Sequence, residues 1–199
     1  SEVNGTNCRY FEMFIHAPFK NDIAGEDRNM TSIVSQLRFD SEKERQIARI
    51  FLAGDTEWRI IEEIMDKTSD DNNLKWDLLE APHHCSYKFF ADDRENDPNQ
   101  ESLDFLEKSE SNAFVISSSK VIKQNSDNPP CQKAKNRYTD RVGKSNFLCT
   151  SGTSEDEADK PIIFVIDNDG LKLLEDKEMS FAAIPPVRDT KPHYYGSTL

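Results

Sequence analysis

Residues 47–86 constrain the fold of this chain most strongly, because their apolar pattern predicts two strands joined by a helix. Residues 47–52 form a short apolar run of the kind found in buried strands, and residues 76–81 form a second one. Between them, residues 56–67 repeat apolar side chains at helical spacing, with Thr56 placed to cap the helix. Such a unit normally makes a right-handed crossover between parallel strands. The sequence therefore predicts an α/β fold.

Polar residues follow each of these two strands. Asp55 comes soon after the first strand, and the pair His83-His84 comes after the second, which Pro82 ends. Because the carboxyl ends of parallel strands meet at one edge of a sheet, we expect Asp55 and the histidines to lie together there. A carboxylate and an imidazole that converge can bind a metal ion. Each also has a simpler interpretation, since Asp55 can cap a helix and a loop histidine can bind backbone carbonyls.

The two segments LAGDTE and WDLLEAPHHCS carry a resemblance to a known family. In this order they resemble the second half of a metallo-β-lactamase-fold hydrolase, in the branch of DNA-uptake competence proteins and cell-wall phosphorylcholine esterases. That branch has a strand ending in TGD, a helix, and a strand ending in PHHGS. The resemblance implies half of an αββα sandwich, a mixed sheet with flanking helices, over residues 1–175. Residues 176–199 form a tail rich in proline and charge.

The resemblance also implies a set of metal ligands. Asp55 corresponds to the aspartate that bridges two metal ions in the family, which are zinc, with manganese as an alternative. His84 corresponds to the terminal ligand when His84-Cys85-Ser86 is aligned with the family's His-Gly-Ser, and His83 is the alternative ligand. Ser86 and Tyr87 are candidates for shaping the substrate pocket. Cys85 stands where the family has glycine, which changes the turn without removing the ligand.

The family's first half is missing from this sequence. The four histidines, His16, His83, His84 and His193, form no His-x-His pair, whereas the family takes most of its metal ligands from a His-x-His-x-Asp-His motif. Asp55 with one or two histidines does not complete a tetrahedral zinc site. We therefore expect an N-terminal half to be supplied by a longer precursor or by a separate chain.

Two functions are consistent with this pattern. The first is a metal-dependent hydrolase that attacks a phosphodiester, amide or ester once its missing half is supplied. The second is a non-catalytic protein-interaction module on a degenerate form of the same fold. The presence or absence of the first-half ligands in the natural assembly discriminates between them.

Charge narrows the choice of partners. The net charge of -12 and the pI near 4.8 disfavour binding of long nucleic acid, although metal ions can neutralise phosphates locally. Residues 120–144 are the exception, with seven basic residues against two acidic ones. This basic segment, together with the tail, is a candidate surface for an acidic partner or a phosphate-bearing substrate, or else a solvated helix face.

The remaining sequence predicts a cytoplasmic protein without a membrane span. The four cysteines lack CxxC spacing and are expected to be reduced thiols, and no stretch is apolar enough to cross a bilayer.

Outside the central unit, we expect strands at residues 8–16, 29–39, 113–119, 147–150 and 161–167, helices at 101–108 and 131–142, and a final hairpin turning at Asp169-Gly170. In the strand at 29–39, Ile33, Ser35, Leu37 and Phe39 alternate as in a half-buried strand, and Leu103 and Leu106 are predicted to face inward.

Overall fold

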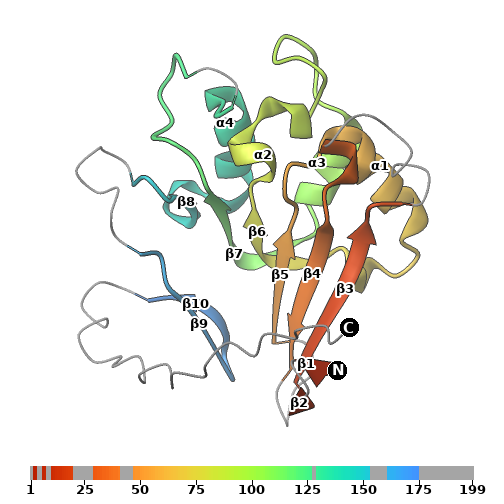
Figure 1. Cartoon of the computed structure of the whole chain (residues 1–199). Coiled ribbons are helices and arrows are strands. Elements are labelled where there is room, and N and C mark those ends of the chain that lie inside the picture. The colour runs from red at the N-terminus through yellow and green to blue at the C-terminus, as the bar shows by residue number, and fades with distance from the viewer. Residues whose placement is uncertain are drawn as a thin grey trace, which may run out of the picture.

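The computed structural model describes residues 2–3, 6–7, 10–19, 29–40, 47–126, 129–152 and 161–174, and it has an α/β architecture (Figure 1). Its main sheet has six strands in the order β3-β4-β5-β6-β7-β8. These strands are β3 (Phe11–Ala17), β4 (Val34–Phe39), β5 (Ala48–Leu52), β6 (Trp76–Glu80), β7 (Ser109–Ser117) and β8 (Phe147–Cys149). The pairs from β3 to β5 are antiparallel, and those from β5 to β8 are parallel. The predicted mixed sheet is confirmed.

Helices and two small hairpins complete the described structure. The α-helices are α1 (Trp58–Lys67), α2 (Pro82–Cys85), α3 (Gln100–Leu106) and α4 (Gln132–Val142). The 3-10 turns are η2 (Asn29–Thr31), η3 (Asp71–Asn73), η4 (Tyr87–Phe89) and η5 (Lys144–Asn146). The hairpins pair β1 (Glu2–Val3) with β2 (Thr6–Asn7), and β9 (Phe164–Asp167) with β10 (Gly170–Leu173). In the described part, no helix has the length and apolar character needed to cross a membrane.

The central strand–helix–strand unit has the predicted form. β5 and β6 are parallel neighbours, with Phe51 opposite Leu79, and α1 connects them. The predicted cap at Thr56 is wrong, because Glu57 occupies the cap position and makes no side-chain capping bond. The hydroxyl of Thr56 is buried and has no hydrogen-bond partner among the described residues. The helix therefore depends on its apolar face, which buries Ile60, Ile61 and Ile64.

One face of the sheet packs against α1, α3 and α4. Phe51, Leu79, Val115 and Phe147 occupy paired positions on neighbouring strands and belong to one buried core with side chains of these helices. Phe105 of α3 is central to that core, because its ring lies 4.8 Å from the ring of Phe51. The predicted inward residues of this helix are confirmed, because Leu106 is buried in the core and Leu103 packs against it. Phe105, which was not predicted, has no exposure.

The opposite face of the sheet carries a second apolar row. Its members are at paired positions on five neighbouring strands: Met13, Leu37, Ile50, Leu78 and Phe114. The β9–β10 hairpin covers one end, where the rings of Phe114 and Phe164 lie 5.3 Å apart. At the other end Met13 is 54% exposed. Within the described part of the chain, the sheet is therefore apolar on both faces but has helices on only one.

The alternation predicted for β4 places its apolar residues on this second face. Val34 and Gln36 are fully buried on the helix side, whereas Ile33 lies before the strand and is 66% exposed. Gln36 is accommodated because its amide donates to the backbone carbonyls of Asn72 and Lys75, at 3.2 and 2.7 Å. The other predicted strands and helices are present with bounds shifted by a few residues. The proposed tail, residues 176–199, lies outside the described residues.

Candidate functional site

Asp55 lies in a tight turn just beyond the carboxyl end of β5. Gly54 adopts a left-handed backbone with φ of +54°, and a Cβ at this position would approach Ser32 to 3.5 Å. Glycine adopts this conformation without steric cost, which favours the sharp change of direction before Asp55. The Asp55 side chain is 49% exposed, so packing alone does not hold its carboxylate.

The histidine turn, defined as α2 with the following Ser86, lies beyond the end of β6 (Figure 1). His83, His84 and Cys85 all have a left-handed backbone, with φ of 48°, 56° and 65°. A single non-glycine residue in this region costs on the order of 1 kcal/mol or more, and three in succession are rare. Such strain persists only where surrounding contacts define the conformation, and it is common at functional sites. Cys85, which stands where the resembling family has glycine, is one of the strained residues.

Backbone hydrogen bonds hold the histidine turn on two sides. The amide of His83 donates to the carbonyl of Gly54 at 2.8 Å, and the amide of Cys131 donates to the carbonyl of Cys85 at 2.9 Å. The Cys85 thiol is fully buried, and burial raises its pKa to about 12. A thiol in this state is a poor nucleophile, so Cys85 has a structural role in the turn.

His84 is the histidine whose ring faces Asp55. Its Nδ1 lies 2.8 Å from the backbone carbonyl of Ser118, so Nδ1 carries the proton and donates it to that oxygen. Nε2 then lies 3.9 Å from Oδ1 of Asp55. A histidine fixed by a carbonyl through one nitrogen, with the other nitrogen free to bind, is the arrangement typical of metal ligands. The sequence signal for Ser118 was the serine run at the end of β7, but its contact with His84 was not predicted.

The spacing of Asp55 and His84 is close to that of two ligands on one metal ion. Two bonds of about 2.0–2.1 Å at the tetrahedral angle place the ligand atoms about 3.3 Å apart, so the 3.9 Å separation must shorten by about 0.6 Å for both atoms to bind the same zinc ion. Among the described residues, no group of three or more histidine, cysteine, aspartate or glutamate side chains is arranged to hold a metal. Asp55 and His84 therefore do not form a complete ligand set within these residues.

The other predicted site residues occupy supporting positions. His83 is partly buried, and its Nδ1 is a buried atom without a hydrogen-bond partner in the described part of the chain. Ser86 and Tyr87 have no exposed surface. The Ser86 hydroxyl accepts from the amide of Lys88 at 3.2 Å, and the Tyr87 hydroxyl donates to the carbonyl of Asn96 at 3.1 Å. Both side chains are buried beneath the histidine turn and do not line the exposed surface around Asp55 and His84.

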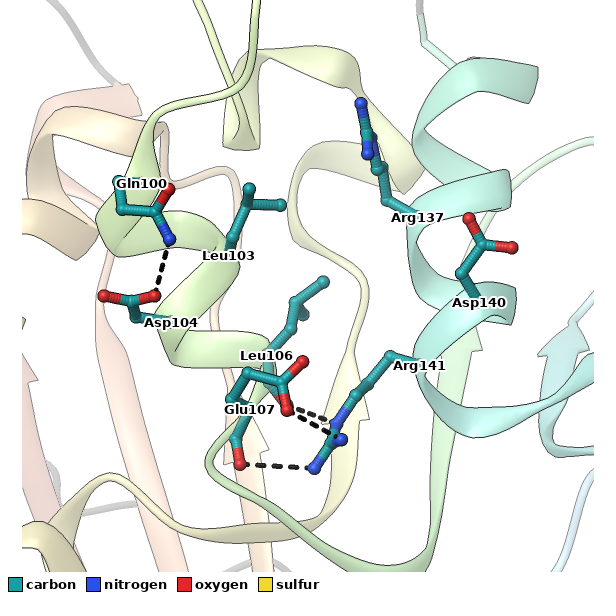
Figure 2. Close-up of a pocket in the computed structure, with 8 residues that line it drawn as sticks. All are labelled: Gln100, Leu103, Asp104, Leu106, Glu107, Arg137, Asp140 and Arg141. Carbon is teal, nitrogen blue, oxygen red and sulfur yellow. Dashed lines mark hydrogen bonds and ion pairs between the residues drawn. The ribbon is translucent and has the colours of Figure 1, made fainter.

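A hollow of about 380 Å³ lies between α3 and α4, away from Asp55 and His84 (Figure 2). Figure 2 shows Arg141 reaching from α4 to the end of α3, where it pairs with Glu107 at 2.8 Å. The same guanidinium donates to the carbonyls of Leu106 and Glu107 and to the Ser109 hydroxyl. These contacts satisfy carbonyls at the carboxyl end of α3, which lack partners within the helix. Arg141 therefore joins two helices of the core layer.

We expect Arg141→Met to lower the free energy of unfolding by about 2 kcal/mol, because it leaves several helix-end carbonyls without their charged donor. Arg137→Met is the matched control, since Arg137 is one turn earlier on α4 and lines the same hollow without a hydrogen bond or ion pair among the described residues. The control should change stability by less than about 0.5 kcal/mol. Urea unfolding measures both values, and equal losses would show that the contacts of Arg141 are not stabilising.

A second hollow, of about 440 Å³, lies at the amino-terminal ends of the parallel strands. It contains Asp77, whose carboxyl pKa is raised by burial although the amide of Arg49 donates to it at 2.7 Å. Arg49 also pairs with Glu110 at 3.3 Å. Open α/β sheets bind ligands at the carboxyl ends of their strands, and these groups are engaged with one another. Asp55 and His84 therefore remain the stronger candidate site.

Comparison of the chain with models of protein families, with curated proteins and with solved structures found no match.

Proposed function

We propose that this chain is part of a metal-dependent hydrolase of the metallo-β-lactamase superfamily, with Asp55 and His84 as metal ligands and His83 as an alternative ligand. A bound zinc or manganese ion supplies Lewis acidity and lowers the pKa of water toward neutrality, which suits hydrolysis of a phosphodiester, amide or ester. The observation that carries the proposal is the orientation of His84, with Nδ1 held by the Ser118 carbonyl and Nε2 at 3.9 Å from Asp55.

The residues of this chain have separate tasks in the proposed site. The Asp55 carboxylate would supply negative charge to the metal and, by the resemblance, would be the ligand that two ions share. His84 binds through Nε2, because its other nitrogen is already used as a donor to Ser118. Both side chains are about half exposed, so incoming ligands from another segment can reach the same ion.

The second apolar row of the sheet supports the proposal that another half of the fold completes the assembly. A sheet that is apolar on both faces must bury each face against another structural element. Helices cover the side of Phe51, but no helix of the described residues covers the part of the row from Met13 to Ile50. A second sheet packed about 10 Å away would bury this row and create the sandwich that the resemblance implies. We propose that the sheet belongs to an N-terminal half, on the same precursor or on a separate chain.

The test is metal binding by the full chain, purified with any chain that accompanies it. We expect Asp55→Asn and His84→Gln each to weaken Zn²⁺ or Co²⁺ binding by more than about 100-fold, since loss of second-shell partners alone costs 10–100-fold. Asp66→Asn is the matched control, because Asp66 is an exposed aspartate near the end of α1. Elemental analysis of the purified assembly gives the stoichiometry. Absence of metal from the unsubstituted assembly, with no Co²⁺ binding, would overturn the enzyme proposal.

The alternative function is a non-catalytic protein-interaction module. It is favoured by Met13, Phe14 and Ile15 of the edge strand β3, which are 54%, 39% and 51% exposed. Met13 and Ile15 lie on the same face of β3, and exposed apolar side chains that lie together often mark protein contacts. The basic segment, residues 120–144, is a second candidate surface, while the net charge of -12 disfavours nucleic acid. Retained partner binding by an assembly that lacks metal would support this alternative.

A further inference from the structure

The separation of Asp55 and His84 depends on how two loops are held together. Asp55 follows β5 and His84 follows β6, and each side chain is about half exposed. Packing does not fix the Asp55 carboxylate, whereas the His84 ring is held through Nδ1 by the Ser118 carbonyl. Any contact that joins the two loops therefore affects whether both residues reach one ion.

Two contacts join these loops beside the site. One is the backbone bond from His83 to Gly54. The other is a side-chain ion pair, in which Nζ of Lys88 lies 3.1 Å from Oε1 of Glu57. Glu57 is two residues after Asp55, and Lys88 is four residues after His84. The ion pair thus links the segment that carries the carboxylate to the segment that carries the imidazole.

The environment of Glu57 makes this ion pair well defined. Its side chain is only 6% exposed, and the same oxygen also accepts from Nδ2 of Asn29 at 3.0 Å. Glu57 occupies the cap position of α1, where the helix dipole favours a negative charge. A nearly buried carboxylate held by two donors has little freedom to move. Removing the negative charge of Glu57 would leave Lys88 without its counter-charge, and removing Lys88 would leave the Glu57 carboxylate without its cation.

We propose that Glu57 is a positioning residue for the metal site, acting through Lys88 to hold the Asp55 loop against the histidine turn. This inference rests on the proposed function, because it assigns Glu57 and Lys88 to the geometry of the same site. It assigns neither residue as a ligand. Its consequence is that metal affinity depends on an ion pair that does not contact the metal.

The test is a Co²⁺ titration of the full chain, purified with any chain that accompanies it, with a parallel measurement of unfolding by urea. We expect Glu57→Gln and Lys88→Met each to weaken Co²⁺ binding about 10–100-fold, the range found for groups that orient metal ligands. The double variant should be little worse than either single variant, because both changes break the same contact. Lys88→Arg keeps the cation and should retain the affinity within about threefold. Glu107→Gln, which removes a charge from a distant ion pair with Arg141, should leave the affinity unchanged.

The outcomes separate this inference from the proposed function. If Asp55→Asn abolishes Co²⁺ binding but Glu57→Gln and Lys88→Met only lower stability, the positioning role is overturned and the metal site stands. If the unsubstituted assembly binds no Co²⁺, both proposals fail. Weaker binding in both variants, with the affinity restored in Lys88→Arg, supports the positioning role. If Glu57→Gln does not fold, Lys88→Met gives the same information, since the Lys88 side chain is 43% exposed.

Discussion

Phe105→Ala is expected to lower the free energy of unfolding by about 3–5 kcal/mol, the range for removing a fully buried phenylalanine. The ring has no exposure and lies among aromatic side chains from three elements. Its centroid is 4.8 Å from that of Phe51, 6.1 Å from that of Phe89 and 6.5 Å from that of Trp76. Few neighbours can move to fill the cavity, because the Trp76 indole is also tied to the Phe105 carbonyl at 3.2 Å. Chemical denaturation measures the loss.

Phe114→Ala is the matched control on the opposite face of the sheet. Phe114 is only partly buried and packs against Phe164 of the β9–β10 hairpin. Its removal should cost about 1–2 kcal/mol in this chain, since burial of its ring is incomplete. Equal losses for the two variants would contradict the unequal covering of the two faces. If the proposed N-terminal half is added, the cost of Phe114→Ala should rise toward that of Phe105→Ala.

Apolar periodicity made the central part of the fold predictable. The helical spacing that includes Ile61 and Ile64 identified α1, and the apolar run ending at Gly54 identified β5. The order of these elements then implied parallel strands and placed Asp55 near the histidines, which the 3.9 Å separation of Asp55 and His84 confirms. The local pattern of apolar residues is sufficient to predict α1 and β5, because each of these elements buries one continuous face.

Other features depend on contacts that local pattern does not encode. The ion pair of Glu57 with Lys88 joins residues 31 positions apart, and His84 meets Ser118 across 34 positions. The left-handed backbone from His83 to Cys85 was also not predictable, since three successive non-glycine residues rarely adopt it. This backbone conformation is held by the hydrogen bonds of the histidine turn with Gly54 and Cys131. The parts of the candidate site that were missed are therefore the contacts between distant segments, while Asp55 and His84 follow from the ends of the strands.

His16 gives a prediction for the pH dependence of stability. Its side chain is 7% exposed and packed between the rings of Phe14 and Phe51, with centroids at 4.7 and 5.0 Å. Burial lowers the pKa of His16 from 6.5 to about 4, and the charge of Arg38 acts in the same direction, against a hydrogen bond with the backbone of Asn73. The folded protein therefore keeps His16 neutral where the unfolded chain takes up a proton. Stability is lost as the pH falls from 6.5 toward 4, by up to about 3 kcal/mol.

His16→Phe should remove this part of the pH dependence. Phenylalanine fills a similar space, and it eliminates the Nε2 atom that is buried without a partner among the described residues. Urea unfolding of both proteins between pH 7 and pH 4.5 should show a difference in stability that shifts in favour of the variant as the pH falls. The comparison cancels the opposite effect of Asp77, whose raised pKa stabilises the folded state at low pH. A pH-independent difference between the two proteins would mean that His16 is protonated as readily in the folded state as in the unfolded chain.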